Sequence, residues 1–164
     1  MDTKAQDAVA IIKLHEIRSE ARMRAARAWF MSEFHPKGGR DILNLLLSGE
    51  KESAFYRMVA SHWDVAASLV NNGGIDEKLF LDANTEHLVV FAKLQPFLSE
   101  VRELMREPDY MQNVERLIRK VPNIEKKLEN RRRPLNQWAS PNTVGGQTSN
   151  IQHLTSFPTC TAFM

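Results

Sequence analysis

Apolar side chains recur at every third or fourth position over most of this chain, and this spacing limits what the chain can fold into. Such spacing places side chains on one face of an α-helix, whereas a half-buried strand needs strict alternation. No stretch alternates over a convincing length. The pattern therefore predicts an all-α protein. The two strongest stripes are Leu88, Phe91, Leu94, Leu98, Val101 and Met105, and then Tyr110, Val114, Leu117, Val121, Ile124 and Leu128.

Turn-forming residues divide this pattern into segments of helical length. Pro96 and Pro122 each lie inside an expected helix and should kink or divide it, because proline lacks a backbone donor and clashes with the preceding turn. Gly73 suits a helix C-cap, and Asp76 suits the cap of the helix that follows. With the short segments counted as minor elements, this predicts an antiparallel bundle of four to five helices. The expected helices span residues 3–34, 40–48, 50–72, 77–82, 84–106 and 109–130.

The composition changes after Arg133. Residues 134–164 contain no Asp, Glu, Lys or Arg, and they are rich in Pro, Asn, Gly, Ser, Thr and Gln. Such a segment has little apolar surface to offset the entropy of ordering it. We therefore expect a helical domain over residues 1–133 and an irregular, uncharged, flexible tail over residues 134–164. The alternative is that apolar residues of the tail pin it to the helical domain.

Charge is nearly balanced overall, at +2, but it is unevenly distributed. Residues 13–40 carry seven basic and three acidic side chains, residues 41–114 carry six and twelve, and residues 115–133 carry eight and three. Two interpretations remain open: neighbouring helices neutralise each other, or the basic segments meet nucleic acid or an anionic membrane surface. The candidate anion contacts are Arg18, Arg22, Arg24, Arg27, Arg116, Arg119, Lys120, Arg131, Arg132 and Arg133.

The sequence carries no recognisable catalytic or cofactor motif. Asp82, Glu86 and His87 are close in sequence, but they lack the repeated Glu-x-x-His pairs of a di-metal helical bundle. No Gly-x-Ser-x-Gly turn is present, and the glycine pairs lack the spacing of a phosphate-binding loop. We therefore expect no catalytic residue, no cofactor and no metal site.

Three observations indicate a soluble, cytoplasmic protein. Cys160 is the only cysteine, which excludes an intramolecular disulfide and fits a reducing compartment. The N-terminal segment opens with acidic residues and lacks the apolar centre of a signal peptide. No run approaches the roughly 18–20 apolar residues of a membrane span, so no transmembrane segment is expected.

The segment from His62 to Phe80 combines an aromatic–acid pair, Trp63 and Asp64, with a glycine turn and an Ile-Asp-Glu start of the next helix. It resembles a pattern in small bacterial helical proteins classed as domains of unknown function. The resemblance extends over about residues 24–106. Some of these relatives carry an N-terminal membrane anchor before an Arg-rich helix. The Arg-rich helix corresponds to residues 18–27 here, and we expect no anchor, so the resemblance does not imply membrane attachment. The resemblance implies no activity, substrate or catalytic residue.

The residues themselves support two further expectations within this segment. Trp63 is predicted to be a core aromatic, because it lies on the apolar stripe of its helix. Asp64 is either the buried partner of a helix end or a surface charge.

Three functional hypotheses follow. The first is a non-enzymatic helical protein that acts through protein–protein contacts, with an unknown partner or by self-association. The second is an anion-binding module that uses the basic segments 18–27 and 116–133 on nucleic acid or an anionic membrane surface. The third is an enzyme, which would need a polar cleft around His62, Asp64, Asp82 and Glu86.

Overall fold

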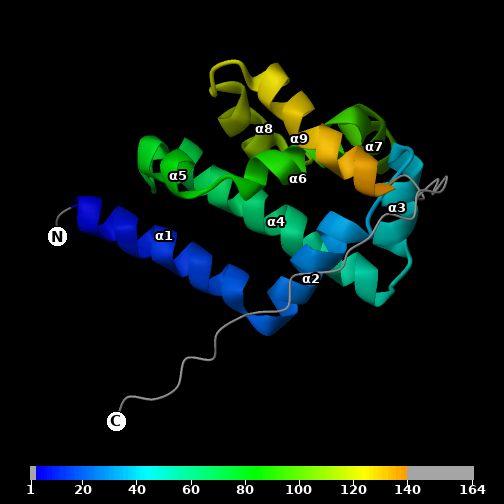
Figure 1. The fold of residues 1–164 in the computed structure, drawn as a ribbon, viewed down its shortest axis with the longest axis horizontal. Helices are drawn as coiled ribbons and strands as arrows, with labels where there is room; N and C mark the ends of the chain where they lie inside the picture. The colour runs from blue at the N-terminus through cyan, green and yellow to red at the C-terminus, as the bar shows by residue number, and fades with distance from the viewer. Residues whose placement is uncertain (1–2, 140–164) are drawn as a thin grey trace, which may run out of the picture.

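The computed structural model describes residues 3–139, and this part of the chain is helical with short connections and no strand (Figure 1). The predicted all-α class is confirmed. The helices are α1 (Thr3–Ser19), α2 (Ala21–Ser32), α3 (Gly39–Leu47), α4 (Lys51–Asn71), α5 (Glu77–Ala83), α6 (Glu86–Leu94), the 3-10 turn η1 (Gln95–Phe97), α7 (Leu98–Met105), α8 (Gln112–Arg119) and α9 (Ile124–Ala139).

The predicted count of four to five helices is wrong, because three of the expected long helices are divided. The helix expected over residues 3–34 divides at Glu20, whose backbone is extended, with φ −60° and ψ 143°. The helix expected over residues 84–106 divides at η1, where Pro96 was expected to interrupt it. The helix expected over residues 109–130 divides between α8 and α9, where Asn123 has a positive φ of 56°.

Helix α9 continues through Pro134 to Ala139, past the expected helix end at Asn130. It therefore crosses the position at which a domain boundary was expected. The rest of the expected tail, residues 140–164, lies outside the described residues.

Helix α4 forms the centre of the fold, with α1 and α2 on one side and α6 and α8 on the other (Figure 1). Its inward face buries large aromatic side chains, and Trp63 is only 1% exposed. The Trp63 ring packs edge-on against Phe80, at 6.4 Å between centroids, and against the His87 ring at 5.7 Å. The prediction that Trp63 is a core aromatic is confirmed.

Two helix pairs complete the structure around α4. Helix α3 packs against α7, and α6 packs against α9. The α3–α7 contact is close because Gly39 has no side chain: a Cβ there would lie 2.8 Å from the Cβ of Glu100. The Gly39 amide also donates a hydrogen bond of 2.6 Å to the Glu100 carboxylate. Any side chain at this position would therefore push the two helices apart.

Local capping explains where several helices begin and end. The Asp76 carboxylate accepts a hydrogen bond of 2.7 Å from the Leu79 amide, so the expected cap of α5 is confirmed. Gly73 has a φ of 75° just beyond α4, the left-handed conformation expected at a C-cap.

Asp64 caps a helix from a distance. Its carboxylate accepts hydrogen bonds of 3.0 Å from the backbone amides of Asn113 and Val114, and one of 2.9 Å from the Asn113 side chain. These amides belong to the first turn of α8, whose backbone donors have no partner within the helix. Of the two roles considered for Asp64, the structure shows the partner of a helix end.

Candidate functional site

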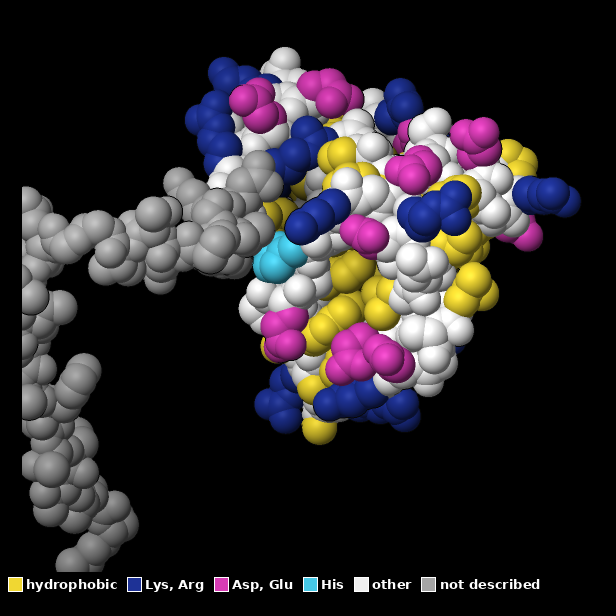
Figure 2. Space-filling view, turned by 90° about the vertical axis from the view of Figure 1, so that its right-hand side faces the viewer, with side chains coloured by type: hydrophobic (Ala, Val, Ile, Leu, Met, Phe, Trp, Pro, Cys, Tyr) yellow, Lys and Arg dark blue, Asp and Glu magenta, His cyan; other side chains and the backbone are white. Residues whose placement is uncertain are grey.

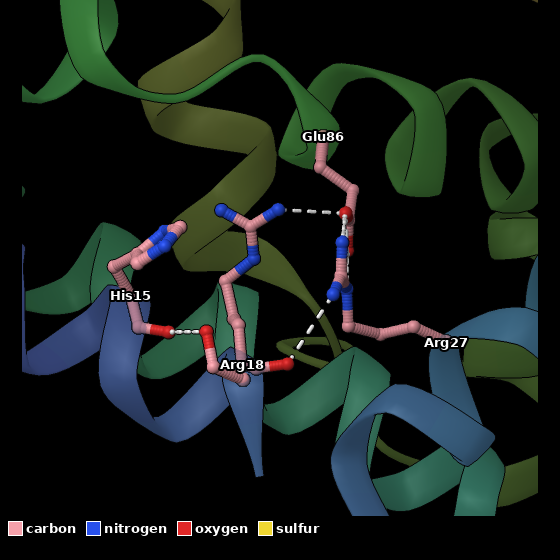
Figure 3. A network of polar contacts seen from close by, with 5 residues as sticks. His15, Arg18, Arg27 and Glu86 are labelled. Atoms are coloured by element: carbon pink, nitrogen blue, oxygen red, sulfur yellow. Dashed lines mark hydrogen bonds and ion pairs between the residues drawn. The ribbon is translucent and has the colours of Figure 1, made fainter. Parts of the chain in front are cut away.

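The first candidate site is a cluster of three charged side chains where the α1–α2 turn meets the start of α6 (Figure 3). Arg18 Nη2 donates a hydrogen bond of 2.7 Å to Glu86 Oε2. Arg27 Nε lies 2.8 Å from Glu86 Oε1, and the Arg27 guanidinium also contacts Oε2. Arg27 further donates to the Arg18 carbonyl, at 3.2 Å. We call Arg18, Arg27 and Glu86 the Arg–Glu–Arg cluster.

The break at Glu20 is what allows both arginines to reach one carboxylate. It turns the chain between Arg18 on α1 and Arg27 on α2, so their side chains converge on Glu86 from two directions (Figure 3). The side chain of Glu86 is 13% exposed. Burial by itself raises the pKa of Glu86, but the hydrogen bonds and charges of Arg27 and Arg18 outweigh it, so the pKa falls below its ordinary value. The carboxylate is therefore held in its ionised form.

The cluster rests on the aromatic core. The Arg18 guanidinium lies 5.0 Å from the centre of the Trp63 ring, in cation–π contact. The His62 ring contacts the same tryptophan edge-on, at 4.9 Å, and His87 lies between Trp63 and Phe80. Arg18 thus connects the charged cluster to a group of buried rings.

Both histidines of this ring group are held neutral. Burial, followed by the positive charge of Arg18, lowers the pKa of His62 to about 4. Burial, followed by the charges of Arg131 and Arg18, lowers the pKa of His87 to about 4. Neither ring nitrogen of His87 has a hydrogen-bond partner among the described protein atoms. A charged imidazole is unfavourable at both positions, because burial and nearby arginines oppose it; at His62 the negative charge of Glu86 acts in the other direction and is outweighed.

The second candidate site is a groove of about 1030 Å³ between α6 and α9, which we call the α6–α9 groove. One wall comes from α5, the turn after it and α6; the other comes from Val121, Pro122 and α9, and Met31 of α2 also contributes. Most of the lining is apolar. The residues that line it are Met31, Leu81, Asp82, Asn84, Thr85, Glu86, His87, Leu88, Val89, Val121, Pro122, Lys127, Asn130, Arg131, Pro134 and Leu135.

The charges at the two walls differ in how they are neutralised. On the α5–α6 wall, Glu86 is paired with two arginines and Asp82 with Lys78 at 2.5 Å. On the α9 wall, Lys127 and Arg131 are exposed and form no ion pair with any residue in the 3–139 range. The groove therefore combines a largely apolar lining with two basic side chains that have no ion-pair partner among residues 3–139.

The ten candidate anion contacts differ in whether they bind other parts of the chain. Six of them bind other parts of the described chain: Arg18 and Arg27 contact Glu86, Arg119 contacts Glu115, Lys120 contacts Glu77, Arg133 contacts Glu129, and Arg132 donates to the Ala92 carbonyl and the Gln95 side chain. The other four form no ion pair or side-chain hydrogen bond between residues 3 and 139: Arg22, Arg24, Arg116 and Arg131.

Basic and acidic side chains are also mixed on the surface. On the face drawn in Figure 2, Lys and Arg alternate with Asp and Glu around exposed hydrophobic side chains. This face has no broad area of one sign.

Lys93 is a buried cation that sequence reasoning did not single out. Its ammonium donates hydrogen bonds of 2.6 and 3.3 Å to the carbonyls of Phe30 and Met31, near the C-terminal end of α2. It also lies over the rings of Phe30 and Phe34. Burial lowers the pKa of Lys93 to about 8. Because helix C-termini attract cations, this contact fixes α6 against α2.

The four residues named for an enzyme cleft do not share one cavity. Asp82 and Glu86 line the α6–α9 groove, whereas His62 packs on Trp63 and Asp64 caps α8. Within residues 3–139, no three His, Cys, Asp or Glu side chains are grouped so as to hold a metal ion. No helix in this part of the chain combines the length and apolarity that crossing a membrane requires.

Sequence reasoning missed the Arg–Glu–Arg cluster and the groove, although part of the groove left a signal. Lys127, Asn130, Arg131, Pro134 and Leu135 are spaced as one helical face, which is visible in the sequence. That the face lines a groove depends on where α9 lies relative to α6.

Comparison with known proteins identifies the family. Residues 3–121 match the model of a domain of unknown function, DUF4760, so the chain belongs to this family, and the resemblance noted from His62 to Phe80 is confirmed. No curated protein and no solved structure matches the chain.

Proposed function

We propose that this member of the DUF4760 family is a non-enzymatic binding module, and that it acts through protein–protein contact at the α6–α9 groove. The observation that carries the proposal is the groove itself, with its size and its largely apolar lining. Exposed apolar surface of this kind is typical of sites at which another molecule docks.

The walls of the groove suit a preformed docking surface. The Arg–Glu–Arg cluster fixes the start of α6, and Arg132 fixes α9 by a hydrogen bond of 2.9 Å to the Ala92 carbonyl of α6. A rigid surface loses little conformational entropy when a partner binds.

The polar groups at the groove support a binding role over a catalytic one. The Glu86 carboxylate is occupied by two arginines, and the ring nitrogens of His87 are enclosed. A general acid or base must come within hydrogen-bond reach of a substrate. Neither group is free to do so in this arrangement.

A matched pair of variants tests the proposal. Val89→Glu places a charge in the groove, and Val65→Glu places the same charge on the exposed face of α4, where Val65 is 58% exposed. Both proteins are used as bait in native extract, with bound proteins identified by mass spectrometry. We expect a specific partner to be retained by the wild type and by Val65→Glu, and lost with Val89→Glu. Equal retention by both variants, or loss only with Val65→Glu, would contradict the proposal.

Light scattering of the purified chain separates a foreign partner from self-association. A mass that rises with concentration in the wild type but not in Val89→Glu would make a second copy of the chain the occupant of the groove. A constant monomer mass would leave only a different protein as partner.

The second candidate function is anion binding. It rests on Arg22, Arg24, Arg116 and Arg131, which have no partner in the described part of the chain. Phosphate backbones bind such side chains with a steep dependence on salt, through release of counterions. Retention on heparin that falls sharply with added salt would support this function. If the protein passes through the heparin column at low salt without being retained, the anion-binding function is wrong.

A further inference from the structure

The α6–α9 groove is lined by two packed helices and by the turn before one of them. On one wall Leu88 and Val89 come from α6, and Asn84 and Thr85 come from the turn between α5 and α6. The α9 wall presents one helical face, with the five residues noted above, from Lys127 to Leu135. A groove between two packed helices is the arrangement that receives the apolar side of an amphipathic helix.

The charged residues that line the groove indicate which kind of partner helix it would bind. Arg18, Arg27 and Lys78 already neutralise the acidic residues of the α5–α6 wall. Lys127 and Arg131 have no ion-pair partner among residues 3–139. Residues 134–164 contain no Asp or Glu side chain that could neutralise them. An occupant with acidic side chains would therefore meet two cations that no residue in the 3–139 range pairs with, and a basic occupant would be repelled.

The spacing of the two cations adds a geometric requirement. Lys127 and Arg131 are four residues apart, so they lie one turn, about 5–6 Å, apart on the same side of α9. Two carboxylates one turn apart on a facing helix would match them. The apolar side of that helix would meet Leu88, Val89 and Leu135.

We infer that the α6–α9 groove binds an acidic amphipathic helix of a partner protein, whose apolar side enters the groove and whose acidic edge pairs with Lys127 and Arg131. This inference rests on the proposed function, since it names the partner class of the same groove.

Two labelled peptides of about 18 residues, or five turns, test it directly. Both carry leucines at helical spacing; one has glutamates along the edge of the apolar side, and the other has lysines at the same positions. Binding is measured by fluorescence polarisation with the full chain. We expect the wild type to bind the acidic peptide at least about 10-fold more tightly than the basic one.

Charge reversal supplies the matched control. The double variant Lys127→Glu with Arg131→Glu should lower the affinity for the acidic peptide by about 10-fold and raise the affinity for the basic peptide. Lys37→Glu with Arg40→Glu changes the net charge equally, at exposed positions that do not line the groove, and should change either affinity by less than about 3-fold. Circular dichroism confirms that each variant remains helical.

The outcomes separate the inference from the proposed function. Equal binding of the two peptides, binding of neither, or an equal loss in the Lys37/Arg40 variant overturns the acidic-helix inference. The proposed function would then still stand if Val89→Glu removes a protein captured by the wild type. If Val89→Glu binds the acidic peptide as tightly as the wild type, the groove is not the binding site and the inference is overturned.

Discussion

Each basic segment of this chain contains a pair of basic side chains, and the two pairs have different surroundings. In the first, Arg18 and Arg27 turn inward and join α1 and α2 to α6 through one carboxylate. In the second, Lys127 and Arg131 stay exposed at the edge of a groove. The difference lies in what the fold places opposite them. Glu86, 59 and 68 residues away in the sequence, meets the first pair, and no described acidic residue meets the second. Clusters of arginine therefore do not by themselves predict a surface for anions.

Removing the shared carboxylate should have the largest effect on stability. Glu86→Ala leaves two partly buried guanidinium groups close together without a counter-charge. We expect the free energy of unfolding to fall by about 3 kcal/mol in urea denaturation. Glu129→Ala is the control, because its ion pair with Arg133 is 3.3 Å long and exposed, and its loss should change stability by less than about 0.5 kcal/mol. An equal loss of stability in the two variants would mean that the buried ion pairs of Glu86 contribute no more than the exposed pair of Glu129.

The second largest effect is expected from acidification, which should destabilise the protein through its buried histidines. The folded-state pKa of His87 is about 4, below the ordinary value of 6.5, so the unfolded chain binds more protons between these values. Stability should therefore fall as the pH drops below about 6.5. The expected loss from His87 between pH 7 and pH 5 is about 2 kcal/mol. His62 acts in the same direction.

The variant His87→Phe isolates that contribution, because a ring of similar size fits between Trp63 and Phe80 without titrating. Urea denaturation at pH 7 and pH 5 should show a pH-dependent loss smaller by about 2 kcal/mol than in the wild type. An unchanged pH dependence would mean that His87 is not held neutral in the folded protein.

Asp64 is an acidic residue that, unlike Glu86, binds backbone amides and an asparagine side chain instead of arginines. Asp64→Ala removes the acceptor for two backbone amides of α8 and for the Asn113 side chain. The loss of a helix cap predicts a decrease of about 1–2 kcal/mol in the free energy of unfolding. Asp109→Ala, at an exposed position just before α8, should change it by less than about 0.5 kcal/mol. A larger effect at Asp109 would show that local sequence caps α8.

Removing Lys127 and Arg131 should have the smallest effect on stability. Lys127→Ala with Arg131→Ala should change the free energy of unfolding by less than about 0.5 kcal/mol, because neither side chain forms an ion pair in the described structure. The same change should raise the pKa of His87, since the charge of Arg131 helps to lower it. NMR titration of the His87 ring measures this shift. A marked loss of stability would mean that the α9 cations hold the fold together.

Much of the helical structure could be predicted from neighbouring residues. The stripes from Leu88 to Met105 predicted buried positions, and Pro96, Gly73 and Asp76 predicted a division, an end and a start of helices. These features depend on backbone geometry and capping within a few residues. The break at Glu20 had no such signal. Glu20 is neither proline nor glycine, and its side chain makes no capping hydrogen bond.

The sequence by itself determined the helical class and the local caps, because each depends on residues within a turn or two of one another, and the uneven distribution of charge can be counted along it. Only the tertiary structure decided which charges are neutralised and which have no ion-pair partner among residues 3–139. An ion pair requires two side chains within a few ångströms, and Glu86 reaches Arg18 and Arg27 only after α6 packs beside the α1–α2 turn. The α6–α9 groove has the same origin, since a groove is formed by two helices and belongs to neither sequence alone.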